Sequence, residues 1–178
     1  MATMQDHLDS TTVRAETPDG TAAATLVGDS RVTISFAPGY YAHSTDARVA
    51  DKLQRLGRLL WVARMREYYR FKSEQLGREV RGEGRPRTAA QAERREARDQ
   101  IVATGSSGDG LVEISAVGLF RWSVTVRPGT VPTVPEADLC AAVSRAAEAL
   151  ISDHRWRLRL VWSGPGAARR LAADGTDR

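Results

Sequence analysis

The sequence predicts an α+β protein made of two β-β-α units in tandem. A segment of twenty-one residues occurs twice, as DGTAAATLVGDSRVTISFAPG at 19–39 and as DGLVEISAVGLFRWSVTVRPG at 109–129, ninety positions later. Similarity over this length indicates two copies of one supersecondary unit. Each copy alternates apolar and polar residues, as half-buried strands do, and is followed by an apolar stripe with helical spacing.

Each copy is predicted to form a β-hairpin, over about residues 20–37 and 110–127. Alternation of this kind buries one face of an antiparallel sheet and leaves the other face in water. Gly28 and Gly118 mark the turn between the two strands, and a Pro-Gly pair stops the second strand. The apolar positions of that second strand are Val32, Ile34 and Phe36 in one copy and Trp122, Val124 and Val126 in the other.

A helix is expected after each hairpin. The first should begin at Ser44 or Thr45, and the second follows Thr133 and Glu136, which have the spacing of a capping box, with Pro135 in the first turn. The apolar stripes are Val49, Leu53, Leu56, Leu60 and Ala63 in the first helix and Leu139, Val143, Ala146, Ala147, Leu150 and Ile151 in the second.

The remaining segments complete the predicted domain organisation. Gly and Pro between Arg81 and Arg87 forbid a continuous helix, and Thr88 is a plausible cap for a further helix over about 89–102. Residues 155–162 fit either an added edge strand, by their alternation, or a continuation of the preceding helix. The expected divisions are 1–17 (flexible lead that could hold a short helix), 18–81 (first unit), 82–87 (linker), 88–162 (second unit) and 163–178 (disordered tail).

Composition limits the class of protein. The 178 residues, 19.5 kDa, are enough for one domain or two small ones. No apolar run approaches the ~18 residues that span a bilayer, and the N-terminus lacks the apolar core of a secretory signal, so a cytoplasmic location is expected. The single cysteine, Cys140, excludes an intrachain disulfide and is expected to be a packed small side chain.

Catalytic patterns are weak. His7, His43 and His154 have no metal-ligand spacing with a cysteine or carboxylate. The glycine-rich stretch at 105–110 lacks the Lys-Ser/Thr of a phosphate-binding loop and leads into a strand. We therefore expect no enzymatic activity, no catalytic residue, no metal site, no cofactor and no small-molecule substrate.

Arginine is concentrated in one part of the chain. The net charge is only +4, yet the pI is about 9.7, and most basic residues between Arg55 and Arg98 are arginines interrupted by glutamates. One interpretation is a solvated helix face held by Glu–Arg pairs such as Glu67 with Arg70. The other is a phosphate-binding surface, because guanidinium groups bind phosphate oxygens bidentately. The candidate nucleic-acid-binding residues are Arg64, Arg66, Arg70, Lys72, Arg78, Arg81, Arg85, Arg87, Arg94, Arg95 and Arg98.

Arginines also lie beside tryptophans near the end of the second helix. Arg157 and Arg159 with Trp156 and Trp162 could bind nucleic acid by charge and stacking. The alternative is that the tryptophans complete a core or a dimer contact.

The segment 97–129 closely resembles the YbaB/EbfC family of bacterial nucleoid-associated proteins. VATGSSGDGLV at 102–112 takes the place of the family's glycine-rich loop, and Val126-Arg127-Pro128 takes the place of its Ile-Asp-Pro. The helix from Thr133 to about Arg155 takes the place of the family's second helix. The resemblance covers about residues 88–155, and the first copy, about 18–80, resembles only the hairpin and second helix.

This resemblance implies a function. Family members look like intertwined homodimers that bind DNA with modest sequence preference through basic helical surfaces. A chain with two copies would be a fused pseudo-dimer, with a high effective concentration of one half for the other. The copies differ at aligned positions, with Trp122 against Val32 and Phe120 against Ser30. The expected function is low-specificity binding of double-stranded DNA in the nucleoid.

A protein-interaction role is the alternative. Some single-repeat actinobacterial relatives look like accessory or chaperone-like factors in type VII secretion settings, and the abundance of Ala, Arg and Gly here suggests a high-GC actinobacterium. In that case the same helices would bind a protein partner, or would bind a second copy of the chain to form a homodimer.

Overall fold

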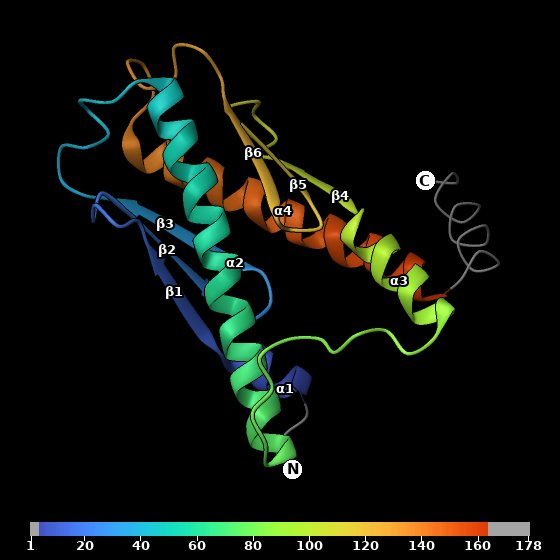
Figure 1. Ribbon diagram of the computed structural model, residues 1–178. Coiled ribbons are helices and arrows are strands. Elements are labelled where there is room, and N and C mark those ends of the chain that lie inside the picture. Colours follow the sequence, from blue (N-terminus) through green and yellow to red (C-terminus); the bar gives the residue numbers. More distant parts are fainter. Residues whose placement is uncertain (1–3, 164–178) are drawn as a thin grey trace.

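The computed structural model describes residues 4–163, and it is an α+β protein with ten helices and strands in that range (Figure 1). The two halves repeat one order of elements, a short helix, three strands and a long helix. The first half contains α1 (Met4–Ser10), β1 (Thr12–Glu16), β2 (Ala22–Val27), β3 (Arg31–Phe36) and α2 (Asp46–Leu76). The second contains α3 (Ala89–Asp99), β4 (Val102–Ser106), β5 (Val112–Val117), β6 (Arg121–Val126) and α4 (Glu136–Ser163). Both predicted hairpins are confirmed as β2–β3 and β5–β6.

Each half has its own three-stranded antiparallel sheet, so every unit contains one strand more than the sequence predicted. The strand orders are β1-β2-β3 and β4-β5-β6. The segment 1–17, expected to be a flexible lead, contains a helix and the edge strand β1. The stretch 102–112, expected to be a loop, begins with the edge strand β4. Pairing is equivalent in both sheets, with Thr12 opposite Val27 and Val102 opposite Val117.

The two long helices join the halves reciprocally. Helix α2 packs on β1 and β2 of its own sheet and also on β6, while α4 packs on β4 and β5 and also on β3 (Figure 1). The core is therefore shared, and its most buried large side chains, Leu56, Leu139 and Leu150, come from both helices. Gly105 on β4 allows the closest approach, because a Cβ there would lie 2.0 Å from the carbonyl oxygen of Ala146 on α4.

Polar contacts also connect the halves. The Asp46 carboxylate, at the first residue of α2, accepts hydrogen bonds from the backbone N–H groups of Gly129 at 2.7 Å and Val131 at 2.8 Å. The Tyr41 hydroxyl donates to the Val134 carbonyl oxygen at 2.8 Å. These bonds fix the start of α2 against the loop that precedes α4.

Two of the three predicted helix starts are confirmed. The Thr45 and Thr88 side chains accept hydrogen bonds from Arg48 N and Gln91 N and so cap α2 and α3. The capping box of Thr133 with Glu136 is wrong. The Thr133 hydroxyl donates to the carbonyl oxygen of Gly129, and α4 begins only at Glu136, after a turn around Thr130.

The end of the second unit is helical. Helix α4 continues to Ser163, so residues 155–162 form a helix and no edge strand. Residues 164–178, assigned to the predicted tail, lie outside the described residues. Among residues 4–163, no helix combines the length and the apolar character needed to cross a lipid bilayer.

Candidate nucleic-acid interface

A groove of about 990 Å³ lies where the end of α2, the connection 77–88, α3 and the end of α4 meet. We call it the basic groove, because eight basic side chains and two carboxylates line it. The acidic residues are Glu79 and Glu83. The basic residues are Lys72, Arg78, Arg81, Arg85, Arg87, Arg94, Arg95 and Arg98.

The connection 77–88 has no helix or strand, yet it is held at both ends. Gly77 ends α2 in the left-handed conformation with φ of 59°, which turns the chain back toward the helix. The Val80 N–H then donates to the Ser73 hydroxyl at 2.8 Å. Further along, Glu83 forms ion pairs with Arg95, at 3.0 Å, and with Arg98.

Helix α3 separates its charges by face. Residues at i, i+3, i+4 and i+7 lie on one side of an α-helix. Gln91, Arg94, Arg95 and Arg98 have this spacing and all line the basic groove. The acidic side chains Glu93 and Glu96 lie on the opposite side of α3 and do not line it. Since α3 has no buried residue, its sequence is not explained by a core-packing requirement.

The charges in the basic groove are only partly balanced. Arg98 donates to Glu83, and this hydrogen bond holds the pKa of the Glu83 carboxyl below its ordinary value, so that it is ionised at neutral pH. Arg81 is paired with Glu79 at 2.6 Å. Four exposed arginines form no ion pair with any described residue: Arg78, Arg85, Arg87 and Arg94.

Aromatic side chains lie beside these cations. Tyr68 and Trp162 line the same groove, and Trp162 is 56% exposed. Lys72 Nζ lies 5.8 Å from the centre of the Tyr68 ring. Tyr68 is half-buried, so Trp162 is the ring of this groove that is open to a base. Rings beside cations are typical of surfaces that contact single-stranded nucleic acid.

Eight of the eleven predicted nucleic-acid-binding residues thus meet in one groove, and three do not. Arg64 is buried, only 9% exposed, and its guanidinium pairs with Asp29 at 3.1 Å, so its assignment to a surface is wrong. Burial lowers the pKa of Arg64. Arg70 lies outside the groove and is held by Glu67 and Glu74. Arg66 is exposed and lines a neighbouring groove.

The residues near the end of α4 were expected either to bind nucleic acid or to complete a core or a dimer contact, and they do not all lie together. Trp162 belongs to the basic groove, whereas Arg157 is paired with Asp153 at 2.8 Å. Trp156, at 37% exposed, lines neither the basic groove nor its neighbour.

Comparison of the chain with protein-family models, with curated proteins and with solved structures finds no match. The structure itself therefore defines the class: an α+β protein of two like units, with a basic groove at one end.

Proposed function

We propose that this chain is a non-enzymatic protein that binds double-stranded DNA with low sequence specificity. The observation that carries the proposal is the basic groove, with eight basic side chains against two carboxylates. Guanidinium groups match phosphate oxygens in charge and geometry. The four arginines without an ion-pair partner among the described residues would contact phosphates first.

The reciprocal packing of the two halves supports the finer part of the proposal. Each long helix covers strands of both sheets, as expected if two YbaB/EbfC-like units form an intrachain pseudo-dimer. Such a protein would associate with the nucleoid in the cytoplasm. Helix α3 and the connection 77–88 would then supply the DNA-binding surface of one half.

Low specificity follows from the kind of contact that the groove offers. Long arginine side chains on an irregular connection suit phosphates, and phosphate contacts position a protein without reading sequence. Four to five such contacts would give a slope of log Kobs against log salt of about −4.

Fluorescence anisotropy tests this proposal directly. Two labelled duplexes of equal length and unrelated sequence would be titrated with the protein over a salt series. We expect equal affinities within about threefold, with a slope of about −4 for both duplexes. An absence of binding at low salt would refute DNA binding, and a large difference between the duplexes would refute low specificity.

A specific observation favours protein interaction as a second candidate. A second groove between α2, α3 and α4 shares charged residues such as Arg95 and Arg98 with the basic groove. We call it the apolar groove, because its wall also holds the apolar side chains Trp61, Val62, Met65 and Phe120. Phe120 is 63% exposed and Val62 is 46% exposed. Exposed apolar surface of this kind suits a contact with another protein. That protein would be a partner in secretion, to which this chain is an accessory factor, or a second copy of the chain in a homodimer.

One double variant separates the two candidates. F120S/V62S should abolish a protein contact at the apolar groove and leave DNA affinity within about twofold of the parent, because it adds no charge beside the arginines of the basic groove. If sedimentation and pull-down show a complex that this variant loses, while DNA binding is absent in the parent, the protein-interaction candidate replaces the first.

A further inference from the structure

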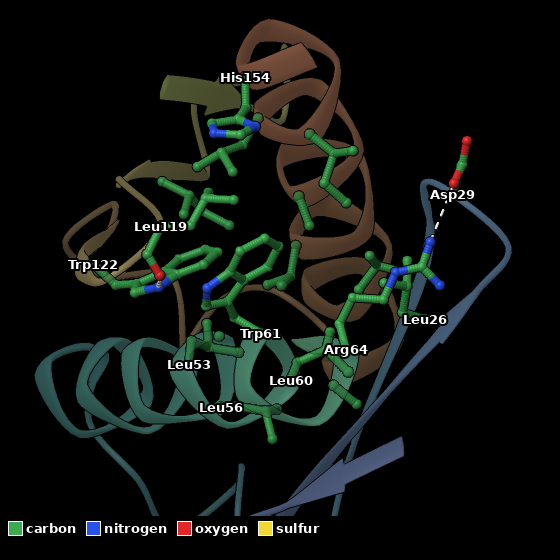
Figure 2. A pocket seen from close by; sticks show the side chains of 18 of the residues that line it. Leu26, Asp29, Leu53, Leu56, Leu60, Trp61, Arg64, Leu119, Trp122 and His154 are labelled. Carbon is green, nitrogen blue, oxygen red and sulfur yellow. Dashed lines mark hydrogen bonds and ion pairs between the residues drawn. The ribbon is translucent and has the colours of Figure 1, made fainter. Parts of the chain in front are cut away.

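A cavity of about 400 Å³ lies between the two halves of the molecule (Figure 2). It adjoins the apolar groove and shares Trp61, Leu119 and His154 with it. Its walls come from α2, α4, β2, β3, β5 and β6, so neither half forms it alone. Its volume is within the ~300–1,000 Å³ typical of small-molecule sites. Apolar side chains form most of the wall, among them Leu53, Leu60, Trp61, Leu119, Trp122 and Ile151.

Divergence between the two copies explains why space remains there. Trp122 on β6 packs against Gly57 on α2, where a Cβ would lie 3.0 Å from the indole Cε3 atom. The aligned positions ninety residues away hold Val32 and Ala147, and both line the cavity. An isopropyl and a methyl group fill less space than an indole, so the symmetry-related region is left unfilled.

The same divergence gives the cavity one charged end. Asp29 forms ion pairs there with Arg64, at 3.1 Å, and with Arg155. Figure 2 shows Asp29 and Arg64 on one side of the cavity and Leu119 and Trp122 on the other. Leu119 is the residue aligned with Asp29, so the equivalent position in the other half is apolar.

The charges of the wall favour an anionic ligand head at Arg155. Arg64, Arg155 and Asp29 are its charged residues, and the one carboxylate of Asp29 pairs with both arginines. His154, aligned with Arg64, also lines the wall, and burial lowers its pKa, so it is neutral at pH 7. Asp9 and Glu67 also attract Arg64, and Glu67 is itself held by Arg70 and His7.

We propose that this cavity binds an amphiphile with one acyl chain and one carboxylate. The carboxylate lies at Arg155, whose side chain is 45% exposed, next to Arg64. The acyl chain runs between α2 and α4 toward Trp122 and Leu119. Arg155 shares the Asp29 carboxylate with Arg64, so one negative head completes its pairing, and the apolar wall matches the chain.

Tryptophan quenching by 12-bromododecanoic acid tests this site, because a bromine atom quenches an indole that it contacts. Trp61 and Trp122 line the cavity, whereas Trp156 and Trp162 do not. We expect saturable quenching at one equivalent, below the concentration at which the probe forms micelles. Octanoic, decanoic and dodecanoic acids should compete with the probe, and their affinity should rise about fourfold with each methylene group. No saturable quenching, or no dependence on chain length, would overturn the proposal.

Variants locate the head and the chain. Arg155→Gln should weaken dodecanoate binding about tenfold or more and leave binding of 12-bromododecanol unchanged. Arg159→Gln makes the same charge change on the same helix away from the cavity and should have no effect. Ala147→Phe should fill the cavity and abolish binding; Ile151→Phe serves the same purpose if the first variant fails to fold, as judged by circular dichroism. Equal affinity for the acid and the alcohol would refute the carboxylate assignment.

A vesicle experiment distinguishes the source of the chain. Phosphatidylglycerol vesicles offer acyl chains with an anionic head in a bilayer. We expect the parent protein to bind soluble dodecanoate without sedimenting with these vesicles. Sedimentation with vesicles and no binding of free acid would contradict a single-chain ligand. The DNA titration uses another surface, so either proposal can fail alone.

Discussion

Removing the Glu83 charge should strengthen DNA binding. Glu83 is one of the two carboxylates in the basic groove and pairs with both Arg95 and Arg98. In Glu83→Gln both guanidinium groups lose their attraction to this carboxylate. Arg98 keeps its ion pair with Asp99, so Arg95 is the arginine that gains freedom to contact a phosphate. One additional contact would make the slope of log Kobs against log salt more negative by about 0.9.

Fold stability should change little in this variant. Glu83 is 40% exposed, and exposed ion pairs contribute only about 0–1 kcal/mol each to the free energy of unfolding. Glutamine also keeps a hydrogen-bond acceptor for Arg95 and Arg98. Urea denaturation should therefore show a loss of about 1 kcal/mol or less.

The assay compares Glu83→Gln with Glu113→Gln. Glu113 is exposed on β5 and outside the basic groove, so this variant has the same net charge change. Both are titrated with one duplex by anisotropy over a salt series. A more negative slope for Glu83→Gln alone supports the proposed interface. Equal slopes for the two variants and the parent would refute the reasoning, because Arg95 would then not contact phosphate.

Three further predictions concern the fold. Gly105→Ala should lower the free energy of unfolding by about 1–3 kcal/mol or more, because the new methyl group clashes with α4. Gly82→Ala is the control and should cost far less, because the space around Gly82 is open. Equal melting temperatures for the two variants would contradict this packing. Asp46→Ala removes two hydrogen bonds between the halves and should cost about 1–3 kcal/mol in urea denaturation, and an unchanged midpoint would count against that contact. Burial raises the pKa of the Cys140 thiol to about 11, so about one thiol in a thousand is ionised at pH 8. Labelling of Cys140 by a disulfide reagent should therefore be slow, because the thiolate is the reactive form. Labelling as fast as in the unfolded chain would disprove this.

Local patterns predicted the hairpins and long helices because those elements are determined by residues close in sequence. The turns at Gly28 and Gly118 and the alternation around them fixed both hairpins. The edge strands were missed for a physical reason. Strand β1 has only Val13 and Ala15 as buried apolar residues, and β4 carries Gly105 where α4 packs. Each edge strand forms by pairing with the hairpin that follows it, β1 with β2 and β4 with β5, so its own residues indicate it only weakly.

Arg64 shows a signal that the sequence contained. It follows Leu53, Leu56 and Leu60 at the next helical step of four, so it lies on the buried face of α2. Counting charges in the run placed it on the surface, whereas the helical spacing would have placed it inside. Its partner Asp29 comes from the β2–β3 turn, and no local pattern could have indicated that contact.

The basic groove was predictable in composition but not in shape. The spacing of Arg94, Arg95 and Arg98 defines one face of a helix from sequence alone. The connection 77–88 folds back on this face through contacts between residues distant along the chain, such as Glu83 with Arg95 and Arg98. The unequal copies, Trp122 against Val32, indicated different packing volumes, but only the three-dimensional arrangement of α2 and α4 produces a cavity.

The most direct test of the central claim is the difference in salt slope between two triple variants. R85Q/R87Q/R94Q removes three arginines from the basic groove, and R31Q/R48Q/R121Q removes three exposed arginines elsewhere, with the same net charge change. We predict that the first variant loses about 2.7 units of slope and most of its affinity for a duplex, while the second keeps the parent slope within about 0.5. Equal losses in the two variants, or a larger loss in the second, would contradict binding at the basic groove.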